Sequence, residues 1–147
     1  MDQAANEEEA ERPGNWQRLS LGVIALGFVT IFVIAIYLKP DPRGFGTHQQ
    51  LGLPPCTFKA LTGFGCPHCG MTTSFSNIVR GRFDAAWVAN PLGILLASAF
   101  ALSIPWCLGT AFSGRWIWTD RPFQWFVWGT IAYLTLAIVV WLVREFL

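Results

Sequence analysis

Residues 19–38 form the apolar run LSLGVIALGFVTIFVIAIYL, which contains no charged side chain. Two further charge-free apolar runs follow at residues 91–112 and 123–143. A helix of this length can cross a hydrocarbon layer about 30 Å thick. We therefore expect an all-α membrane protein with three transmembrane helices rather than a soluble helical domain. The short link at residues 113–122 predicts that the second and third helices are antiparallel neighbours.

The composition agrees with a membrane protein and excludes some partners. The 147 residues are 53% hydrophobic and 13% charged, whereas a soluble domain has about 25% charged residues. The net charge is +1, so no field of one sign points to nucleic acid. We expect membrane lipids and other proteins of the membrane as partners.

The chain divides into a tail and one membrane domain. Residues 1–18 are acidic and polar and predict a disordered tail, with Glu7, Glu8 and Glu9 before the first apolar run. A cleaved signal peptide has a basic start and a shorter apolar core, so we interpret the first run as a retained anchor. Residues 19–147 then form a single membrane domain, in which residues 39–90 are the sizeable segment outside the membrane core.

Basic residues bear on the orientation in the membrane, because cytoplasmic loops carry an excess of Lys and Arg. We expect a bacterial inner-membrane protein with residues 39–90 on the cytoplasmic side. The two sides carry six and four basic residues: Lys39, Arg43, Lys59, Arg80, Arg82 and Arg144 on the cysteine side, against Arg12, Arg18, Arg115 and Arg121 on the other.

The segment 39–90 contains three of the four cysteines, and we name it the cysteine segment. Its central stretch reads Gly65-Cys66-Pro67-His68-Cys69-Gly70-Met71-Thr72-Thr73-Ser74, and Cys56 lies ten residues before Cys66. We expect one short helix over residues 55–62, ended by Gly63 in a left-handed conformation. A second helix is expected from Pro67 to about Arg80, with Cys66 as its N-cap. The fourth cysteine, Cys107, lies in the second apolar run and is interpreted as a packing residue.

This arrangement places reactive sulfurs together. Cys56 and Cys66 would each lie at a helix N-terminus, where backbone N–H groups stabilise a thiolate. Cys66 and Cys69 are three residues apart, so both can face the same point. His68 could donate to a thiolate or offer a ring nitrogen to a metal ion. We expect the three sulfurs to converge.

The pattern resembles a bacterial membrane family, domain of unknown function 2752. The resemblance rests on Cys56, on Leu61-Thr62-Gly63, on Cys66-Pro67-His68-Cys69-Gly70-Met71-Thr72, and on Gly81, Ala86 and Asn90-Pro91-Leu92. Thr73 stands where that family's pattern C-P-x-C-G-x-T-R has arginine. The resemblance implies a fold and candidate residues but no established activity.

The tetrapeptide Cys66-Pro67-His68-Cys69 also equals the active-site sequence of DsbA-type thiol oxidases. In those enzymes the first cysteine has a pKa of about 3.5. Their thioredoxin fold needs a βαβ pattern around the motif, and no strand pattern is present here. The resemblance is therefore confined to four residues.

Three functions stay open at this point. The first is a structural metal site, in which Zn²⁺ or another thiophilic metal is held by Cys56, Cys66, Cys69 and His68, with His48 or water as a further candidate ligand. The second is a membrane thiol–disulfide oxidoreductase, with Cys66 as nucleophile, Cys69 as resolving thiol and Cys56 as a shuttle partner. The third is a non-catalytic accessory or assembly subunit of a larger membrane complex, in which the cysteines are structural.

Overall fold

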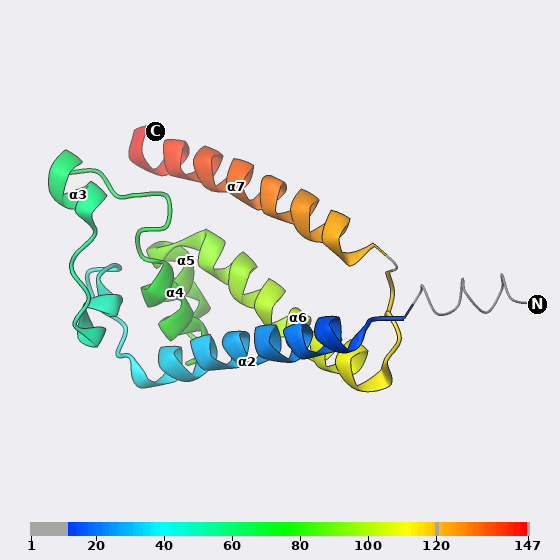
Figure 1. The fold of residues 1–147 in the computed structure, drawn as a ribbon. Helices are drawn as coiled ribbons and strands as arrows, with labels where there is room; N and C mark the ends of the chain where they lie inside the picture. The colour runs from blue at the N-terminus through cyan, green and yellow to red at the C-terminus, as the bar shows by residue number, and fades with distance from the viewer. Residues whose placement is uncertain (1–11, 120, 147) are drawn as a thin grey trace, which may run out of the picture.

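The computed structural model describes residues 12–119 and 121–146, whose regular elements are all helical (Figure 1). Three helices are long and apolar enough to span a membrane: α2 (Asn15–Tyr37), α6 (Pro91–Ser113) and α7 (Pro122–Phe146). Four short elements connect α2 to α6: η1 (Thr47–Leu51), α3 (Thr57–Thr62), α4 (Met71–Ile78) and α5 (Phe83–Ala89). The all-α membrane fold is thus confirmed, and the chain is an integral membrane protein.

The helix ends differ from the predicted spans by a few residues. α2 begins at Asn15, four residues before the charge-free run, and α7 continues to Phe146 through Arg144 and Glu145. The backbone hydrogen bonds of a helix do not require apolar side chains, so a helix can continue past the run that crosses the hydrocarbon layer. Residues 1–11 of the predicted tail lie outside the described residues.

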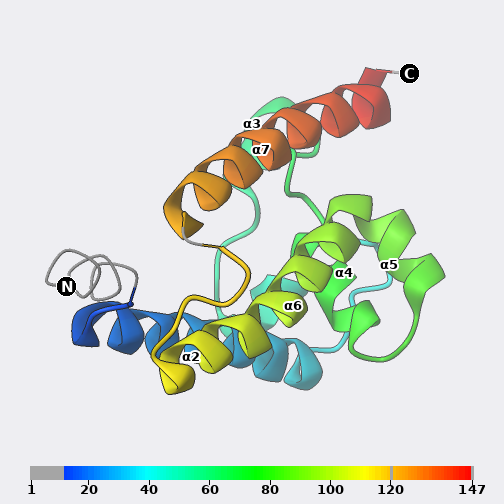
Figure 2. The same cartoon turned by 90° about the vertical axis from the view of Figure 1, so that its right-hand side faces the viewer.

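Helices α2 and α6 pack against each other along their length and run antiparallel (Figures 1 and 2). Small buried residues lie at the contact, among them Ala25 and Ala35 of α2 and Ala97 of α6. Small side chains let two helix backbones approach closely, which is how membrane helices gain packing energy. Cys107 is buried with Leu21 and Ala25, which confirms its interpretation as a packing residue.

The cysteine segment is anchored to this helix pair by α4. Phe75 of α4 forms a buried cluster with Ala35 and Ala97, and the rings of Phe32 and Phe100 lie beside it. Arg80 donates from its guanidinium to the carbonyl oxygens of Ala35 (3.1 Å) and Ile36 (2.7 Å). These carbonyls belong to the last turn of α2 and have no partner within that helix. The segment is therefore fixed at the end where α2 stops and α6 begins.

Helix α7 runs antiparallel to α6, but it does not pack along it (Figure 1). It instead contacts the cysteine segment near its C-terminal end. There Phe58 lies edge-on against Trp141, and Phe64 lies against Phe146. The indole N–H of Trp141 donates to the carbonyl oxygen of Gly65. Helix α7 thus lies against aromatic residues of the cysteine segment and not along α6, contrary to the expected neighbouring pair.

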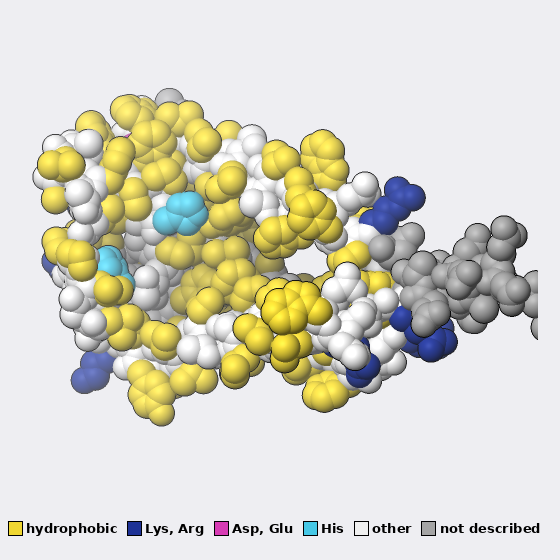
Figure 3. Space-filling model, viewed as in Figure 1, with side chains coloured by type: hydrophobic (Ala, Val, Ile, Leu, Met, Phe, Trp, Pro, Cys, Tyr) yellow, Lys and Arg dark blue, Asp and Glu magenta, His cyan; other side chains and the backbone are white. Residues whose placement is uncertain are grey.

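Apolar side chains dominate the face shown in Figure 3, and the visible Lys and Arg side chains lie near its two ends. Most of α7 is exposed, including Phe123, Trp125, Ile138 and Val143. Lipid tails can cover such a surface, and basic side chains belong at the headgroups. The distribution agrees with an integral membrane protein.

The helix starts within the cysteine segment are partly as predicted. The predicted helix is present as α3, but it begins at Thr57, after its N-cap Cys56, and not at Pro55; it ends before Gly63, which has φ +79° as expected. The prediction that Cys66 caps the next helix is wrong. That helix, α4, begins only at Met71, with Gly70 as its N-cap at φ +86°. Residues 66–70 form tight turns instead, because the left-handed backbone of Gly70 interrupts any helix from Pro67.

Candidate functional site

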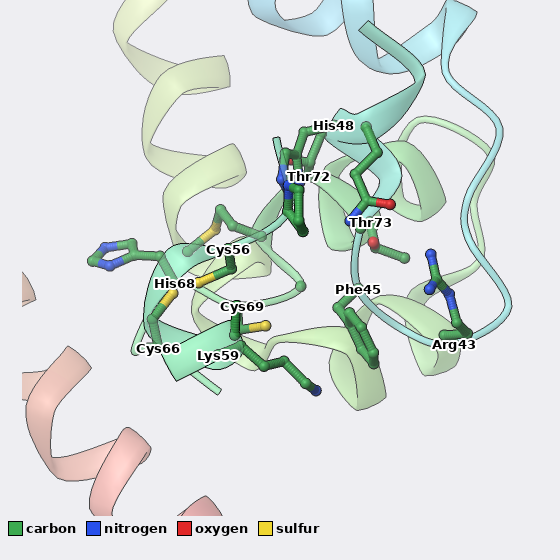
Figure 4. A pocket seen from close by; sticks show the side chains of 16 residues that line it. Arg43, Phe45, His48, Cys56, Lys59, Cys66, His68, Cys69, Thr72 and Thr73 are labelled. Carbon is green, nitrogen blue, oxygen red and sulfur yellow. The ribbon is translucent and has the colours of Figure 1, made fainter. Parts of the chain in front are cut away.

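The three cysteines of the segment line one cavity of about 460 Å³ (Figure 4). Cys56 is placed by the start of α3, whereas Cys66 and Cys69 belong to the turns that precede α4. All three thiols are partly buried and free of disulfide bonds. The tertiary structure therefore brings together residues from both sides of the turn at Gly63.

Cys56 and Cys66 are in direct contact through a hydrogen bond between their side chains. The Cys56 sulfur also accepts hydrogen bonds from the backbone N–H groups of Lys59, Phe58 and Cys66. The Lys59 N–H is the largest influence lowering the Cys56 pKa, and the Cys66 thiol lowers it further. Because its donors stabilise the negative charge, Cys56 is the sulfur best suited to be a thiolate.

Cys66 has the opposite character. Burial raises the pKa of its thiol to about 11, and the hydrogen bond to Cys56 raises it as well. A protonated Cys66 can donate its S–H to a Cys56 thiolate. The predicted assignment made Cys66 the nucleophile, whereas these pKa directions favour Cys56 in that role and Cys66 as its partner.

Cys69 shares the cavity but not this hydrogen bond. Figure 4 shows its sulfur pointing away from the Cys56–Cys66 pair. It packs against the backbone of Gly65, where an added Cβ would lie 3.8 Å from the Cys69 Sγ atom. Cys66 and Cys69 thus form the C-x-x-C motif of the sequence, but the hydrogen-bonded pair of thiols in the structure is Cys56 and Cys66.

The histidines do not complete a metal site. The His68 ring is exposed and points away from the three sulfurs (Figure 4). It lies beside Tyr133 of α7, with 5.9 Å between the ring centroids. The Nε2 atom of His48 is 3.2 Å from the carbonyl oxygen of Pro54. Within residues 12–119 and 121–146, no group of three or more His, Cys, Asp or Glu side chains could hold a metal ion. The zinc site therefore stays a prediction without geometric support.

Asn90 holds the turn that carries Cys66 and Cys69. Its Oδ1 atom accepts from the N–H of Leu92 at 3.0 Å, so Asn90 is the N-cap of α6, and Asn followed by Pro is a sequence pattern that predicts such a cap. Its Nδ2 atom donates to the carbonyl oxygens of Pro67 (3.2 Å) and Cys69 (3.1 Å). The sequence indicated the cap but not this second role, because the N-cap pattern gives no sign of partners more than twenty residues away.

Two other close contacts support the same turn. A Cβ added to Gly70 would lie 2.4 Å from the carbonyl oxygen of Ala89, so the backbones touch there. The buried hydroxyl of Ser74 donates to the carbonyl oxygens of Ala86 and Asn90, each of which is 3.0 Å from the Oγ atom. The start of α4 is therefore joined to the end of α5 by a close backbone contact and by the Ser74 hydroxyl.

The region that contains these residues is also the region that comparison with known families identifies. The matching family model, described as "Protein of unknown function (DUF2752)", covers residues 56–104. Residues 56–104 are thus similar to this family, and we name them the DUF2752 region. Comparison with curated proteins and with solved structures finds no match.

The DUF2752 region runs from the first cysteine of the site through Asn90 and into α6. It thus includes all three sulfurs and the residue that clamps their turn. Thr73, which stands where the expected pattern has arginine, is buried, and its hydroxyl is 2.8 Å from that of Thr47. At this position Thr73 joins α4 to η1.

Proposed function

We propose that this integral membrane protein carries out thiol–disulfide exchange, with Cys56 as the attacking thiolate and Cys66 as the second thiol. The observation that supports this is the donor set around one sulfur. Three backbone N–H groups and the Cys66 thiol all point at Cys56. Only a thiolate attacks a disulfide, so a site that stabilises the thiolate of one cysteine beside a second thiol is suited to exchange.

The reaction begins when the Cys56 thiolate attacks one sulfur of a partner's disulfide, which is the oxidant. The Cys56–partner disulfide forms, the partner's S–S bond breaks, and the first partner thiolate leaves and takes up the proton of Cys66. The Cys66 thiolate then attacks the Cys56 sulfur and releases the second partner thiolate, which is protonated by solvent. The protein thiols are thereby oxidised to a Cys56–Cys66 disulfide, and the partner is reduced to two thiols.

A second candidate is an accessory subunit of a membrane complex, and α7 is the observation that favours it. This helix exposes aromatic and aliphatic side chains on most of its surface and does not pack along α6. A neighbouring protein could cover it as well as lipid could. Both proposals are compatible, because the exchange partner could itself lie against α7.

We further propose that the protein lies in a bacterial inner membrane with the cysteine segment in the cytoplasm, where thiol systems keep such a pair reduced. The exposed positions Arg82 and Ser113 lie towards opposite ends of the α2–α6 pair. Impermeant maleimide applied outside intact spheroplasts should modify a Ser113→Cys variant and not an Arg82→Cys variant, as read by peptide mapping. The reverse pattern would place the cysteine segment outside.

Exchange itself is tested by trapping. The purified full chain is treated with a small disulfide, and each mixed disulfide is located by mass spectrometry. We expect a Cys66→Ser chain to accumulate a stable adduct at Cys56, and a Cys69→Ser chain to proceed to the Cys56–Cys66 disulfide. Accumulation in the Cys69→Ser chain alone would support the Cys66–Cys69 pair instead. A Cys107→Ser chain is the control and should behave like the unmodified protein, and no adduct in any chain would contradict the proposal.

A further inference from the structure

The wall of the cavity next to the three sulfurs carries positive charge. Lys59 and Arg43 both line it, together with Phe45, whose ring they contact. The Lys59 Nζ atom is 3.5 Å from the ring centroid, and the Arg43 Cζ atom is 5.2 Å from it. Figure 4 shows both side chains near Phe45, in the same view as the cysteines.

The two cations differ in their ionic partners. Arg43 forms an ion pair with Asp41, with 2.7 Å between its Nη2 atom and the Oδ2 atom. Among the described residues, no carboxylate lies within ion-pair distance of Lys59, and neither Asp nor Glu lines the cavity. The charge of Arg43 is therefore balanced within the protein, whereas that of Lys59 is offset only by the π face of Phe45.

The size of the cavity sets a limit on what can enter. Its volume of about 460 Å³ is within the range of small-molecule pockets, which is roughly 300–1,000 Å³. A molecule of a few hundred daltons could place one end at Cys56 and the other at Lys59, because both residues line the same space.

We propose that this cavity binds small disulfides that carry carboxylate groups, with Lys59 as the residue that selects for the negative charge. This inference rests on the proposed exchange at Cys56 and adds the class of substrate. The bonds that form and break are those of the proposed exchange at Cys56 and Cys66. The Cys56 thiolate attacks the small disulfide, Cys66 completes the exchange, and two carboxylate-bearing thiols leave the cavity while the Cys56–Cys66 disulfide remains.

The test compares three probes of different charge on the purified full chain in a Cys66→Ser background, where the adduct at Cys56 accumulates. The probes are oxidised glutathione, which carries carboxylates, cystamine, which is cationic, and hydroxyethyl disulfide, which is neutral. Rate constants come from mass spectrometry of the Cys56 peptide, and each rate is divided by that of the neutral probe to remove effects on the thiolate itself.

Lys59→Gln should lower the normalised rate for oxidised glutathione by about fivefold, as expected for the loss of one partly exposed ion pair. The same substitution should leave the rate for cystamine unchanged or raise it. Lys39→Gln is the matched control, because Lys39 is exposed and does not line the cavity, and it should change neither ratio. Raising the salt concentration should reduce the preference for the anionic probe.

The outcomes separate this inference from the function on which it depends. If the neutral probe forms the Cys56 adduct but Lys59→Gln changes no ratio, the substrate class is wrong and the exchange proposal stands. If equal losses follow from Lys59→Gln and Lys39→Gln, the effect is one of net charge and the assigned role of Lys59 is wrong. If none of the three probes reacts at Cys56, the exchange proposal and the substrate class both fail.

Discussion

Asn90 donates its side-chain amide to the carbonyl oxygen of Cys69, 3.1 Å away, while its Oδ1 atom caps α6. One fully buried side chain thus connects the turn of the cysteine motif to the start of a membrane-spanning helix. The position of the Cys66–Cys69 turn consequently depends on a residue of a different structural element.

Replacement of Asn90 should loosen that turn. Asn90→Ser keeps an N-cap hydroxyl but removes the amide that serves Pro67 and Cys69, so two partly buried carbonyl oxygens lose a donor. We expect a loss of about 1–3 kcal/mol in local stability, seen as faster hydrogen exchange at residues 66–70. Asn90→Ala removes the cap as well and should also affect the first turn of α6. Unchanged exchange at residues 66–70 in Asn90→Ser, together with faster exchange of residues 66–70 and of α6 in Asn90→Ala, would show that the cap alone matters.

Gly70→Ala should destabilise the cysteine segment through two separate effects. A left-handed backbone is unfavourable for alanine by about 1–3 kcal/mol, and the new Cβ would lie 2.4 Å from the carbonyl oxygen of Ala89. Gly81→Ala is the matched control, because Gly81 has φ +70° but open space around an added Cβ. In detergent, Gly70→Ala should lower the melting temperature clearly more than Gly81→Ala. Equal shifts would mean that the close contact at Gly70 can relax freely.

The alkylation of Cys56 should have a characteristic dependence on pH. Its lowered pKa means that the thiolate persists to a lower pH than it does at an unperturbed cysteine. Modification of Cys56 by iodoacetamide should therefore reach half its maximal rate at a lower pH in the folded protein than in the unfolded chain, whereas Cys66 should stay slow until about pH 11. Because the Cys56 pKa is lower in the folded protein than in the unfolded chain, its thiolate stabilises the fold fully at a pH above the unfolded-state pKa. This stabilisation is lost as the pH falls through the folded-state pKa. A faster reaction of Cys66 at neutral pH would reverse the assigned roles.

Metal removal should leave the cysteine segment intact. Because the Cys69 sulfur points away from the Cys56–Cys66 pair and His68 lies beside Tyr133, we expect less than one equivalent of zinc per chain and no change in protease cleavage of residues 39–90 after treatment with a strong chelator. A structural zinc site gives the opposite result, because its binding energy is part of the folding energy. Bound zinc, together with increased cleavage in chelated and Cys66→Ser samples, would restore the metal hypothesis.

The sequence by itself determined the elements whose signal is local. The three spans follow from the length of charge-free runs, because burying a helix in hydrocarbon requires that length and little else. α3, with Cys56 before it and Gly63 after it, follows from the left-handed conformation that glycine adopts readily. The N-cap role of Asn90 is likewise set by its immediate neighbours.

The tertiary structure decided which groups meet. The C-x-x-C spacing favoured a Cys66–Cys69 pair, but the fold placed Cys56 against Cys66 and turned the Cys69 sulfur aside. The late start of α4 at Met71 and the separation of α7 from α6 were not predicted either, because each depends on contacts between distant segments, such as Gly70 with Ala89 and Gly65 with Trp141. Such contacts join residues 19 and 76 positions apart in the chain. Their energies depend on packing and burial, which are properties of the folded molecule and not of any local pattern.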